Sequence, residues 1–403
     1  MNFTDLDEFL NYLYALPRLH QRGDLSKIKQ VLNLLGNPQN KMKTVHITGT
    51  NGKGSTAYYI SNLLTKTGHQ TGLFVSPYIR QFNERIQLNG QAISDHDLLT
   101  EVTKVEKVLA QIRQEEPDFQ LVVFEYEVVL AFLYFYDQRV DYAVIEVGIG
   151  GEHDKTNVII PELSVITTVA MDHEQIIGPT LADIAIEKSG IIKQKRPVII
   201  GKMPASVKNI LLKKAKGLEA PIFELGQDFQ LLAEFADKPL VEQYDVAMAI
   251  EATKLLKIAL SEQQEVEIIR TTKIPGRYQV VQTDPLIVLD GGHNPQAIAA
   301  LMTELRQKHP SKIKVLLGMM KDKKIEQVLQ VFSPQEEIYL TRIDYHRAAE
   351  KTDFPTELQS KFDPDYWHAY SQLKASLKVD EILVVTGSFY LVSAILQGEE
   401  DAH

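Results

Sequence analysis

Short, continuously apolar runs alternate with helical stretches along most of this chain. A short buried strand is predicted at 43–48, the apolar runs lie at 73–75, 143–147, 163–169 and 198–200, and the helical stretches lie at 56–67, 95–114, 125–138 and 181–192. Strands that are apolar on both faces are typical of a parallel sheet that helices cover on both sides. The alternation therefore predicts a doubly wound α/β fold.

A glycine-rich loop follows the first of these strands directly. Its sequence is Gly49-Thr50-Asn51-Gly52-Lys53-Gly54-Ser55. Glycines allow a close backbone approach to an anion, and the amides at the start of the next helix point at it. We expect Lys53 to contact the β- and γ-phosphates and Ser55 to face the phosphates and a bound Mg²⁺. Only two residues separate the first glycine from the Gly-Lys pair, where the usual loop has four. A plain strand-to-helix turn is the alternative, but the setting favours nucleotide binding.

A second, shorter series of strands and helices begins after Lys273-Ile274-Pro275-Gly276-Arg277, where Pro-Gly interrupts both kinds of element. Its strands are predicted at 286–289, 314–317, 337–339 and 382–385, and its helices at 295–308 and 324–332. A chain of 403 residues is also too long for one ordinary domain. We expect a P-loop-type ATP-binding domain over 1–273 and a smaller Rossmann-like α/β domain over 278–403.

Charge and composition exclude several classes of partner. The net charge of −10 is wrong for a nucleic-acid-binding surface, so a nucleotide must be attracted by a local cluster of Lys and Arg. The longest apolar run, 128–136, is too short to span a bilayer, and the first ten residues are too acidic for a signal or transit peptide. The chain has no cysteine, which fits a reducing compartment. We expect a cytoplasmic protein without nucleic-acid or membrane partners.

Polar side chains follow several predicted strands, at the sheet edge where open α/β folds bind ligands. Glu146 ends one strand and is followed by glycines, which favours a Mg²⁺ ligand over an acid held only by backbone amides. His173 follows the next strand, where a ligand role and a structural role are equally consistent. Ser76 follows the strand at 73–75, where a plain connection is the alternative. Lys188, taken alone, is only a lysine at a helix end.

Two further segments have weaker signals. Phe124 and Glu125 begin an apolar helix, and core packing explains most of that helix. The run Asp290-Gly291-Gly292-His293-Asn294-Pro295 joins a strand end to a proline that opens a helix. Such a segment offers a second anion or ribose site, or simply a loop.

These motifs, taken in order, resemble those of the folylpolyglutamate synthases and dihydrofolate synthases, which are Mur-type ligases. The matching segments are 49–55, 76–77 with 84–86, 124–125, 146–158, 172–173, 187–191, 275–277 and 290–295. The resemblance extends from Gly23 to Thr386-Gly387-Ser388. It implies an ATP-dependent amide ligase that adds L-glutamate to a folate or to dihydropteroate through an acyl phosphate.

The resemblance also implies roles for single residues. Ser76, Glu146 and His173 would be Mg²⁺ ligands, Lys188 would carry a carbamate, and Lys53 and His293 would act with it in catalysis. Arg277 and Asp290 would contact ATP, as would the 49–55 loop. Phe124, Glu125, His153 and Asp154 would contact the substrate. We further expect a monomer.

The chain departs from the family pattern at three places. Glu152 stands where the family has an arginine, which leaves the substrate contacts there open, and Tyr78 replaces a histidine. The segment 241–246 lacks the asparagine with which the family contacts the nucleotide.

Other functions stay open at this point. One is a related Mur-type ligase that joins another carboxylate and amine, such as a peptidoglycan precursor. Another is a nucleotide-binding switch that ligates nothing, although such a switch needs no second motif at 290–295. The sequence leaves open whether dihydropteroate, a folylpolyglutamate or both are substrates.

Overall fold

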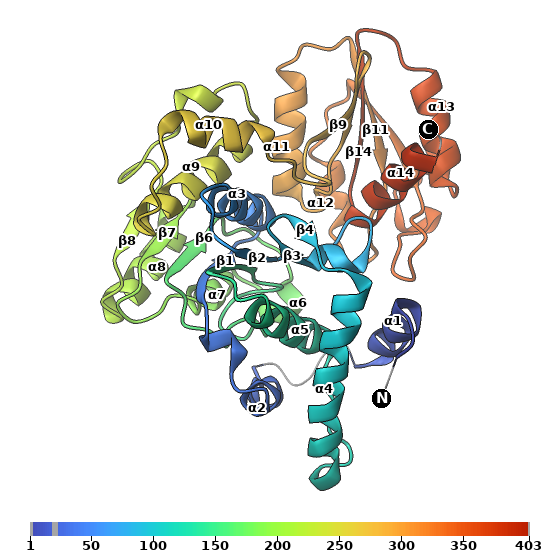
Figure 1. Ribbon diagram of the computed structural model, residues 1–403. Helices are drawn as coiled ribbons and strands as arrows, with labels where there is room; N and C mark the ends of the chain where they lie inside the picture. Colours follow the sequence, from blue (N-terminus) through green and yellow to red (C-terminus); the bar gives the residue numbers. More distant parts are fainter. Residues whose placement is uncertain (1–2, 18–22, 402–403) are drawn as a thin grey trace. The chain divides into compact units, whose positions relative to one another are not determined.

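The computed structural model describes residues 3–17 and 23–401, and these form two compact units (Figure 1). Unit 1 consists of Met1–Tyr78, Phe82–Asp237 and Glu242–Thr272. Unit 2 consists of Ile79–Gln81, Lys238–Val241 and Lys273–His403. In the described part of the chain, no helix combines the length and the apolar character needed to cross a bilayer.

Unit 1 contains an eight-stranded sheet in the order β4-β3-β2-β5-β1-β6-β7-β8. Its strands are β1 (Lys43–Thr48), β2 (Thr71–Phe74), β3 (Ile86–Leu88), β4 (Gln91–Ala92), β5 (Tyr142–Glu146), β6 (Leu163–Ile166), β7 (Val198–Ile200) and β8 (Ile222–Glu224). The six strands from β2 to β8 are parallel, whereas β3 and β4 pair antiparallel at one edge. The sheet is therefore mixed.

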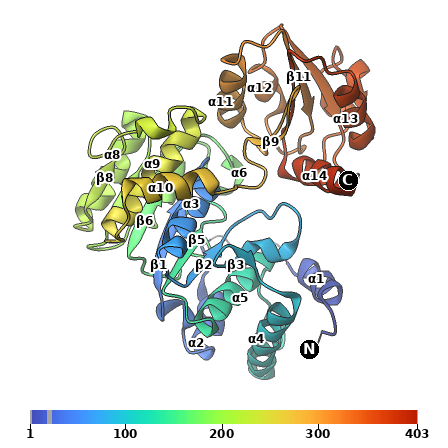
Figure 2. The ribbon, with the colours of Figure 1, turned by 45° about the horizontal axis from the view of Figure 1, so that its top comes forward.

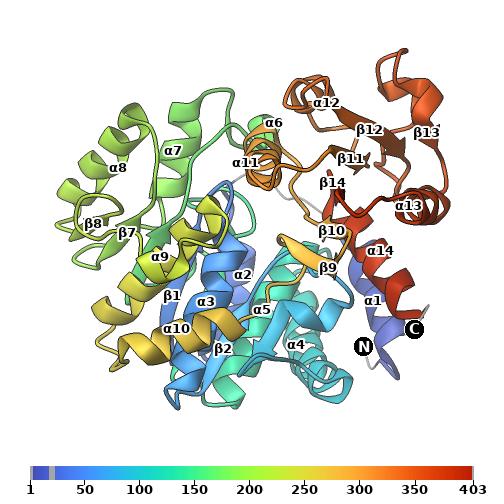
Figure 3. The ribbon, with the colours of Figure 1, turned by 90° about the horizontal axis from the view of Figure 1, so that it is seen from above.

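Helices cover both faces of this sheet. They are α1 (Leu6–Ala15), α2 (Ser26–Leu34), α3 (Lys53–Lys66), α4 (Asp95–Glu115), α5 (Val123–Asp137), α6 (Glu174–Ile177), α7 (Leu181–Ser189), α8 (Ala205–Gly217), α9 (Leu240–Leu255) and α10 (Glu262–Thr271). Ala143 and Ile145 of β5 pack into one core with α1, α2, α4 and α5. Helix α3 contacts the same strand, and α10 lies beside α3 (Figure 3). Burial on both faces explains why β5 is apolar up to its last residue, Glu146.

Unit 2 contains a six-stranded sheet in the order β13-β12-β11-β14-β10-β9. Its elements are β9 (Gln279–Thr283), β10 (Leu286–Leu289), α11 (Pro295–Arg306), β11 (Lys312–Leu317), α12 (Ile325–Leu329), β12 (Glu336–Thr341), β13 (Phe362–Asp363), α13 (Tyr366–Ala375), β14 (Glu381–Thr386) and α14 (Phe389–Asp401). Only β9 runs antiparallel. Helices α11 and α12 pack on one face, and α13 and α14 pack on the other (Figure 2).

The predicted fold class is confirmed: both sheets are largely parallel and have helices on both faces. Strands β1, β7 and β10 have the predicted bounds. Helix α3 begins at Lys53, three residues before the predicted start, so Lys53 and Ser55 lie in its first turn. A further helix that the sequence predicts over 243–260 corresponds to α9, which begins three residues earlier and ends at Leu255, whereas α10 lies beyond the predicted range.

Candidate active site

The glycine loop is held against the strand end of β6. The amide of Thr50 donates to the carbonyl of Thr168 at 2.9 Å, and the amide of Asn51 donates to the Thr168 hydroxyl at 2.9 Å. A Cβ at Gly49 would lie 1.9 Å from the Thr167 hydroxyl oxygen, so that position admits only glycine. The loop thus has a defined shape, as a phosphate-binding loop requires.

Lys53 is held over this loop by backbone contacts. Its Nζ donates to the Gly49 carbonyl at 2.9 Å and lies 3.4 Å from the Thr50 carbonyl. Gly52 precedes Lys53 with a φ of 86°, a conformation that glycine adopts at little cost. The ammonium group of Lys53 is thereby positioned at the N-terminus of α3, where an anion is favoured.

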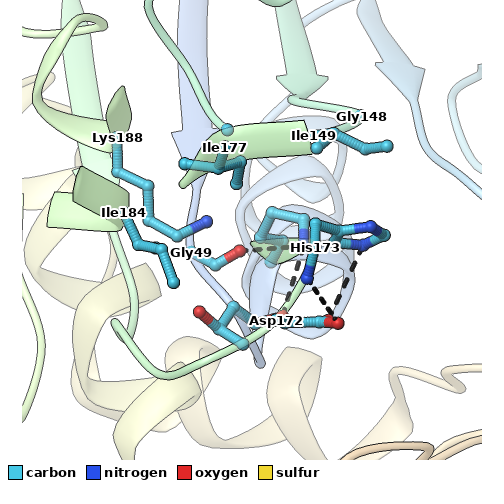
Figure 4. Close-up of a pocket in the computed structure, with 11 residues that line it drawn as sticks. Gly49, Gly148, Ile149, Asp172, His173, Ile177, Ile184 and Lys188 are labelled. Atoms are coloured by element: carbon cyan, nitrogen blue, oxygen red, sulfur yellow. Dashed lines mark hydrogen bonds and ion pairs between the residues drawn. The ribbon is translucent and has the colours of Figure 1, made fainter. Parts of the chain in front are cut away.

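An open pocket lies beside the loop (Figure 4). It is lined by Gly49, Thr50, Lys53, Gly148, Ile149, Gly150, Asp172, His173, Ile177, Ile184 and Lys188. These residues come from the carboxyl ends of β1 and β5, from the start of α3, from the segment after β6 together with α6, and from α7. The predicted loop, histidine and lysine, which are far apart in sequence, therefore share one pocket.

Lys188 extends from α7 into this pocket (Figure 4), and only 4% of the residue is exposed. Burial, and after it the charge of Lys53, lowers the pKa of Lys188 from 10.5 to about 7. Taking an ammonium group out of water disfavours its charged form, and a nearby cation adds to that effect. At neutral pH the amine is therefore substantially uncharged. The sequence did not reveal this, because the helix pattern alone suggests a surface lysine.

His173 has a backbone φ of 51° at the start of α6. Its amide donates to the Asp172 carboxylate at 2.9 Å, and its Nε2 lies 3.6 Å from the other oxygen of that carboxylate. Asp172 thus orients the His173 ring at the pocket. No separate role was predicted for Asp172 from the sequence. Such a carboxylate partner is common for histidines that bind metals.

Glu146 and Ser76 lie together at the ends of β5 and β2. The amide of Ser76 donates to Glu146 Oε2 at 3.0 Å, and a Cβ at Gly54 would lie 3.5 Å from the same oxygen. Neither residue belongs to the set that lines the pocket. Within 3–17 and 23–401 there is no group of three His, Cys, Asp or Glu side chains that could hold a metal ion. A magnesium site here would therefore need hydroxyl, phosphate or carbamate oxygens as well.

Asp154 holds the loop that carries Gly148 and Ile149. Its carboxylate accepts the amides of Ile149, at 2.9 Å, and Thr156, at 3.0 Å, together with the Thr156 hydroxyl. Phe124 packs on the same loop, because a Cβ at Gly148 would lie 2.6 Å from its ring. Burial raises the pKa of Asp154. These contacts give Asp154 and Phe124 a role in shaping one wall of the pocket.

Glu125 and His153, also predicted to contact substrate, pair with protein groups. Glu125 is fully buried, caps α5 by accepting the Val122 amide at 3.0 Å, and lies 2.9 Å from Lys155. His153 Nδ1 lies 2.8 Å from the carboxylate of Glu187, the residue that precedes Lys188 in the sequence. Whether either also contacts a substrate stays a prediction.

In unit 2, three predicted segments meet at the carboxyl ends of β10 and β14. The carboxylate of Asp290 accepts the amides of Tyr278, at 2.8 Å, and Gly292, at 2.7 Å. The Thr386 hydroxyl donates to the Gly292 carbonyl at 3.1 Å. His293 Nδ1 lies 3.1 Å from the Gly291 carbonyl. Asp290 therefore holds this loop in place.

Comparison with known proteins gives concordant results. Residues 47–281 match the Mur ligase middle domain, and residues 276–389 match the Mur ligase, glutamate ligase domain. Folylpolyglutamate synthase of Lacticaseibacillus casei is 34% identical over 98% of both chains. Dihydrofolate synthase/folylpolyglutamate synthase of Bacillus subtilis (strain 168) is 30% identical over 98% of this chain and 99% of its own.

A solved structure described as an FPGS-AMPPCP-folate complex superposes with a TM-score of 0.85 at 32% identity, covering 99% of this chain and 100% of its own. The likeness therefore extends to the whole chain and to both sheets. Together with the order of the motifs, it means that the chain belongs to the Mur ligase family and, within it, to the folylpolyglutamate synthases and dihydrofolate synthases.

Proposed function

We propose that this protein is an ATP-dependent ligase that adds L-glutamate to a folate or to dihydropteroate. Its family membership and its two relatives support the reaction, and the AMPPCP and folate bound by the related FPGS support the substrates. A carboxylate oxygen of the pterin substrate attacks the γ-phosphorus of ATP, and ADP leaves. The glutamate amine then attacks the acyl carbon, phosphate departs with the electrons of the C–O bond, and the nitrogen loses a proton.

The observation that carries this proposal is the pairing of Lys53 and Lys188 in one pocket with the glycine loop. Lys53 supplies a fixed positive charge for the phosphates, where negative charge must be neutralised during phosphoryl transfer. Lys188 is buried, and its lowered pKa leaves a large fraction of it as a nucleophilic neutral amine at neutral pH. A simple nucleotide-binding switch needs the first lysine but has no use for the second.

Lys188 carries a carbamate in this proposal. Its neutral Nζ attacks the carbon of CO₂ and loses a proton, which converts a buried amine into an anion. The positive charge of Lys53 stabilises an anion at this position, and it destabilises the protonated form of Lys188. Burial of the side chain also keeps bulk water from the carbamate.

Glu146, Ser76 and His173 are the residues we propose to hold Mg²⁺. Mg²⁺ prefers oxygen ligands, and waters and substrate phosphates usually occupy several of its coordination positions. Few protein ligands are therefore needed. The buried carboxylate of Glu146 fits the role of a Mg²⁺ ligand near the loop. Gly54 has no side chain, so the loop backbone lies close to an anionic oxygen of Glu146. When bound, Mg²⁺ neutralises charge on the transferred phosphoryl group.

In this proposal the nucleotide is also contacted by Arg277, Asp290 and His293. The acid substrate is contacted by Phe124, Glu125, His153 and Asp154. The cytoplasmic location, the monomeric state and the lack of nucleic-acid partners stay predictions from the sequence.

A substrate panel tests the function directly. Phosphate release is measured with ATP and L-glutamate, adding dihydropteroate in one series and tetrahydrofolates in another. We expect glutamate-dependent release with at least one pterin and none without it. Release with other acids and no response to either pterin would favour a related ligase, whereas ATP binding without acid-dependent release would favour a switch.

A further inference from the structure

We propose that Phe389 is a positioning residue that holds Arg277 ready for the nucleotide. The inference rests on the proposed contact between Arg277 and ATP. Phe389 begins α14, directly after the Thr386-Gly387-Ser388 segment, and the sequence analysis gave it no role. It lies in unit 2 together with Arg277, so every contact below is within one unit.

The guanidinium group of Arg277 lies over the face of the Phe389 ring. Its central carbon is 4.2 Å from the ring centroid, well within the range of a cation–π contact. Phe389 is only 8% exposed, and the rest of its surface packs in the core beneath β10 and β14. A flexible, partly exposed arginine thus rests on a rigid, buried platform.

No carboxylate among the described residues forms an ion pair with Arg277. The other partly buried arginines of the chain behave differently: Arg306, for example, forms a close pair with Glu336. A guanidinium group that is stacked but not paired keeps its in-plane N–H donors for an external anion, and its fork geometry suits a phosphate. Stacking fixes the plane of the group without neutralising its charge.

The same ring also orders the two loops that carry the nucleotide residues. A Cβ at Gly291 would lie 2.4 Å from the ring, and a Cβ at Gly276 would lie 3.4 Å from it. The amide of Gly291 donates to the Gly276 carbonyl at 2.9 Å, which ties the loops together. The His293 ring meets Phe389 edge-on, with centroids 6.2 Å apart. Phe389 therefore contacts both loops as well as Arg277.

The first experiment compares Phe389→Leu with Phe354→Leu in the full-length chain. Phe354 is also buried in unit 2, at 3% exposure, but packs on the other face of the sheet with Phe362, so it controls for the loss of a core ring. We expect Phe389→Leu to raise the KM for ATP about tenfold with kcat within about twofold, because Arg277 remains but is no longer held in place for the nucleotide. Phe354→Leu should leave the KM for ATP unchanged. Should Phe389→Leu not fold, Phe389→Met, whose flexible unbranched side chain adapts to an irregular gap in the core, takes its place.

A double-mutant cycle with Arg277→Ala separates the possible failures. If Phe389 acts through Arg277, Phe389→Leu raises the KM for ATP no further in the Arg277→Ala background. If Arg277→Ala leaves nucleotide binding unchanged, the nucleotide contact in the proposed function is wrong. If Arg277→Ala weakens binding but Phe389→Leu behaves like Phe354→Leu, or if the two changes are additive, the positioning role of Phe389 is wrong.

Discussion

The carboxylate of Asp245, on helix α9, lies directly against Gly52 in the glycine loop. A Cβ added at Gly52 would be 2.3 Å from Asp245 Oδ1, and the Thr56 hydroxyl donates to the same oxygen at 3.3 Å. Asp245 belongs to the 241–246 segment, which lacks the family's asparagine. This segment therefore packs against the glycine loop, and the two can come this close only because residue 52 has no side chain.

Gly52→Ala should weaken nucleotide binding by about tenfold or more, because the new methyl group must displace either the loop or Asp245. Gly68→Ala is the matched control: Gly68 follows the same helix and has a φ of 87°, close to the 86° of Gly52, but nothing lies within 4 Å of its Cβ position. Both variants place a side chain at nearly the same positive φ. Titration with a fluorescent ATP analogue measures the difference, and equal affinities for the two would show that the Asp245 contact is unimportant.

Lys188→Ala should lower ligase turnover by about 100-fold or more, because the site loses the anionic group that we propose forms there. Acetate or formate should restore part of the activity by entering the space left by the side chain. The wild-type enzyme in the same buffers is the control, and depleting it of dissolved CO₂ should also lower its rate. Full activity of the unrescued variant would be incompatible with a carbamate on this lysine.

Glu146→Gln should raise the Mg²⁺ concentration for half-maximal activity by about tenfold or more, because the amide is a much weaker ligand for a hard cation. Its oxygen can still accept the Ser76 amide hydrogen bond, so the fold should change little. Mg²⁺ titrations and urea unfolding are the two measurements. An unchanged Mg²⁺ titration would remove Glu146 from the metal site.

His46 predicts a specific pH dependence of stability. It is fully buried in β1, its Nε2 lies 2.9 Å from the Thr156 hydroxyl, and burial lowers its pKa from 6.5 to about 3. Between these values only the unfolded chain takes up the proton, so the contribution of His46 is complete above pH 6.5 and is lost as the pH falls towards 3. By pH 5 the loss is about 2 kcal/mol.

His46→Gln keeps an N–H donor for Thr156 and removes this titration. Its free energy of unfolding should therefore fall less between pH 7 and pH 5 than that of the wild type, by about 2 kcal/mol. Urea unfolding at the two pH values measures this change in the free energy of unfolding for both proteins. An equal change in the two would mean that His46 takes up a proton in the folded state as readily as in the unfolded chain.

Much of the parallel core could be predicted because buried central strands carry a strong local signal. The runs at 43–48, 198–200 and 286–289 became β1, β7 and β10 without a change of bounds. The antiparallel strands β3, β4 and β9 escaped prediction, since they are short and partly exposed and lack a continuous apolar run. The start of α3 was misplaced because its first turn contains Gly54, a poor helix former.

The sequence by itself determined the chemistry that is available: a glycine loop with Lys53, acids and a histidine at strand ends, and an order of motifs that indicates a Mur-type ligase. Only the tertiary structure decided which groups surround Lys188, Asp245 and Phe389. Their properties depend on burial and on neighbours distant in the chain: Lys188 is desolvated beside Lys53, Asp245 lies behind Gly52, and Phe389 lies beneath Arg277. Local sequence carries no signal for such contacts, because packing alone brings these residues together.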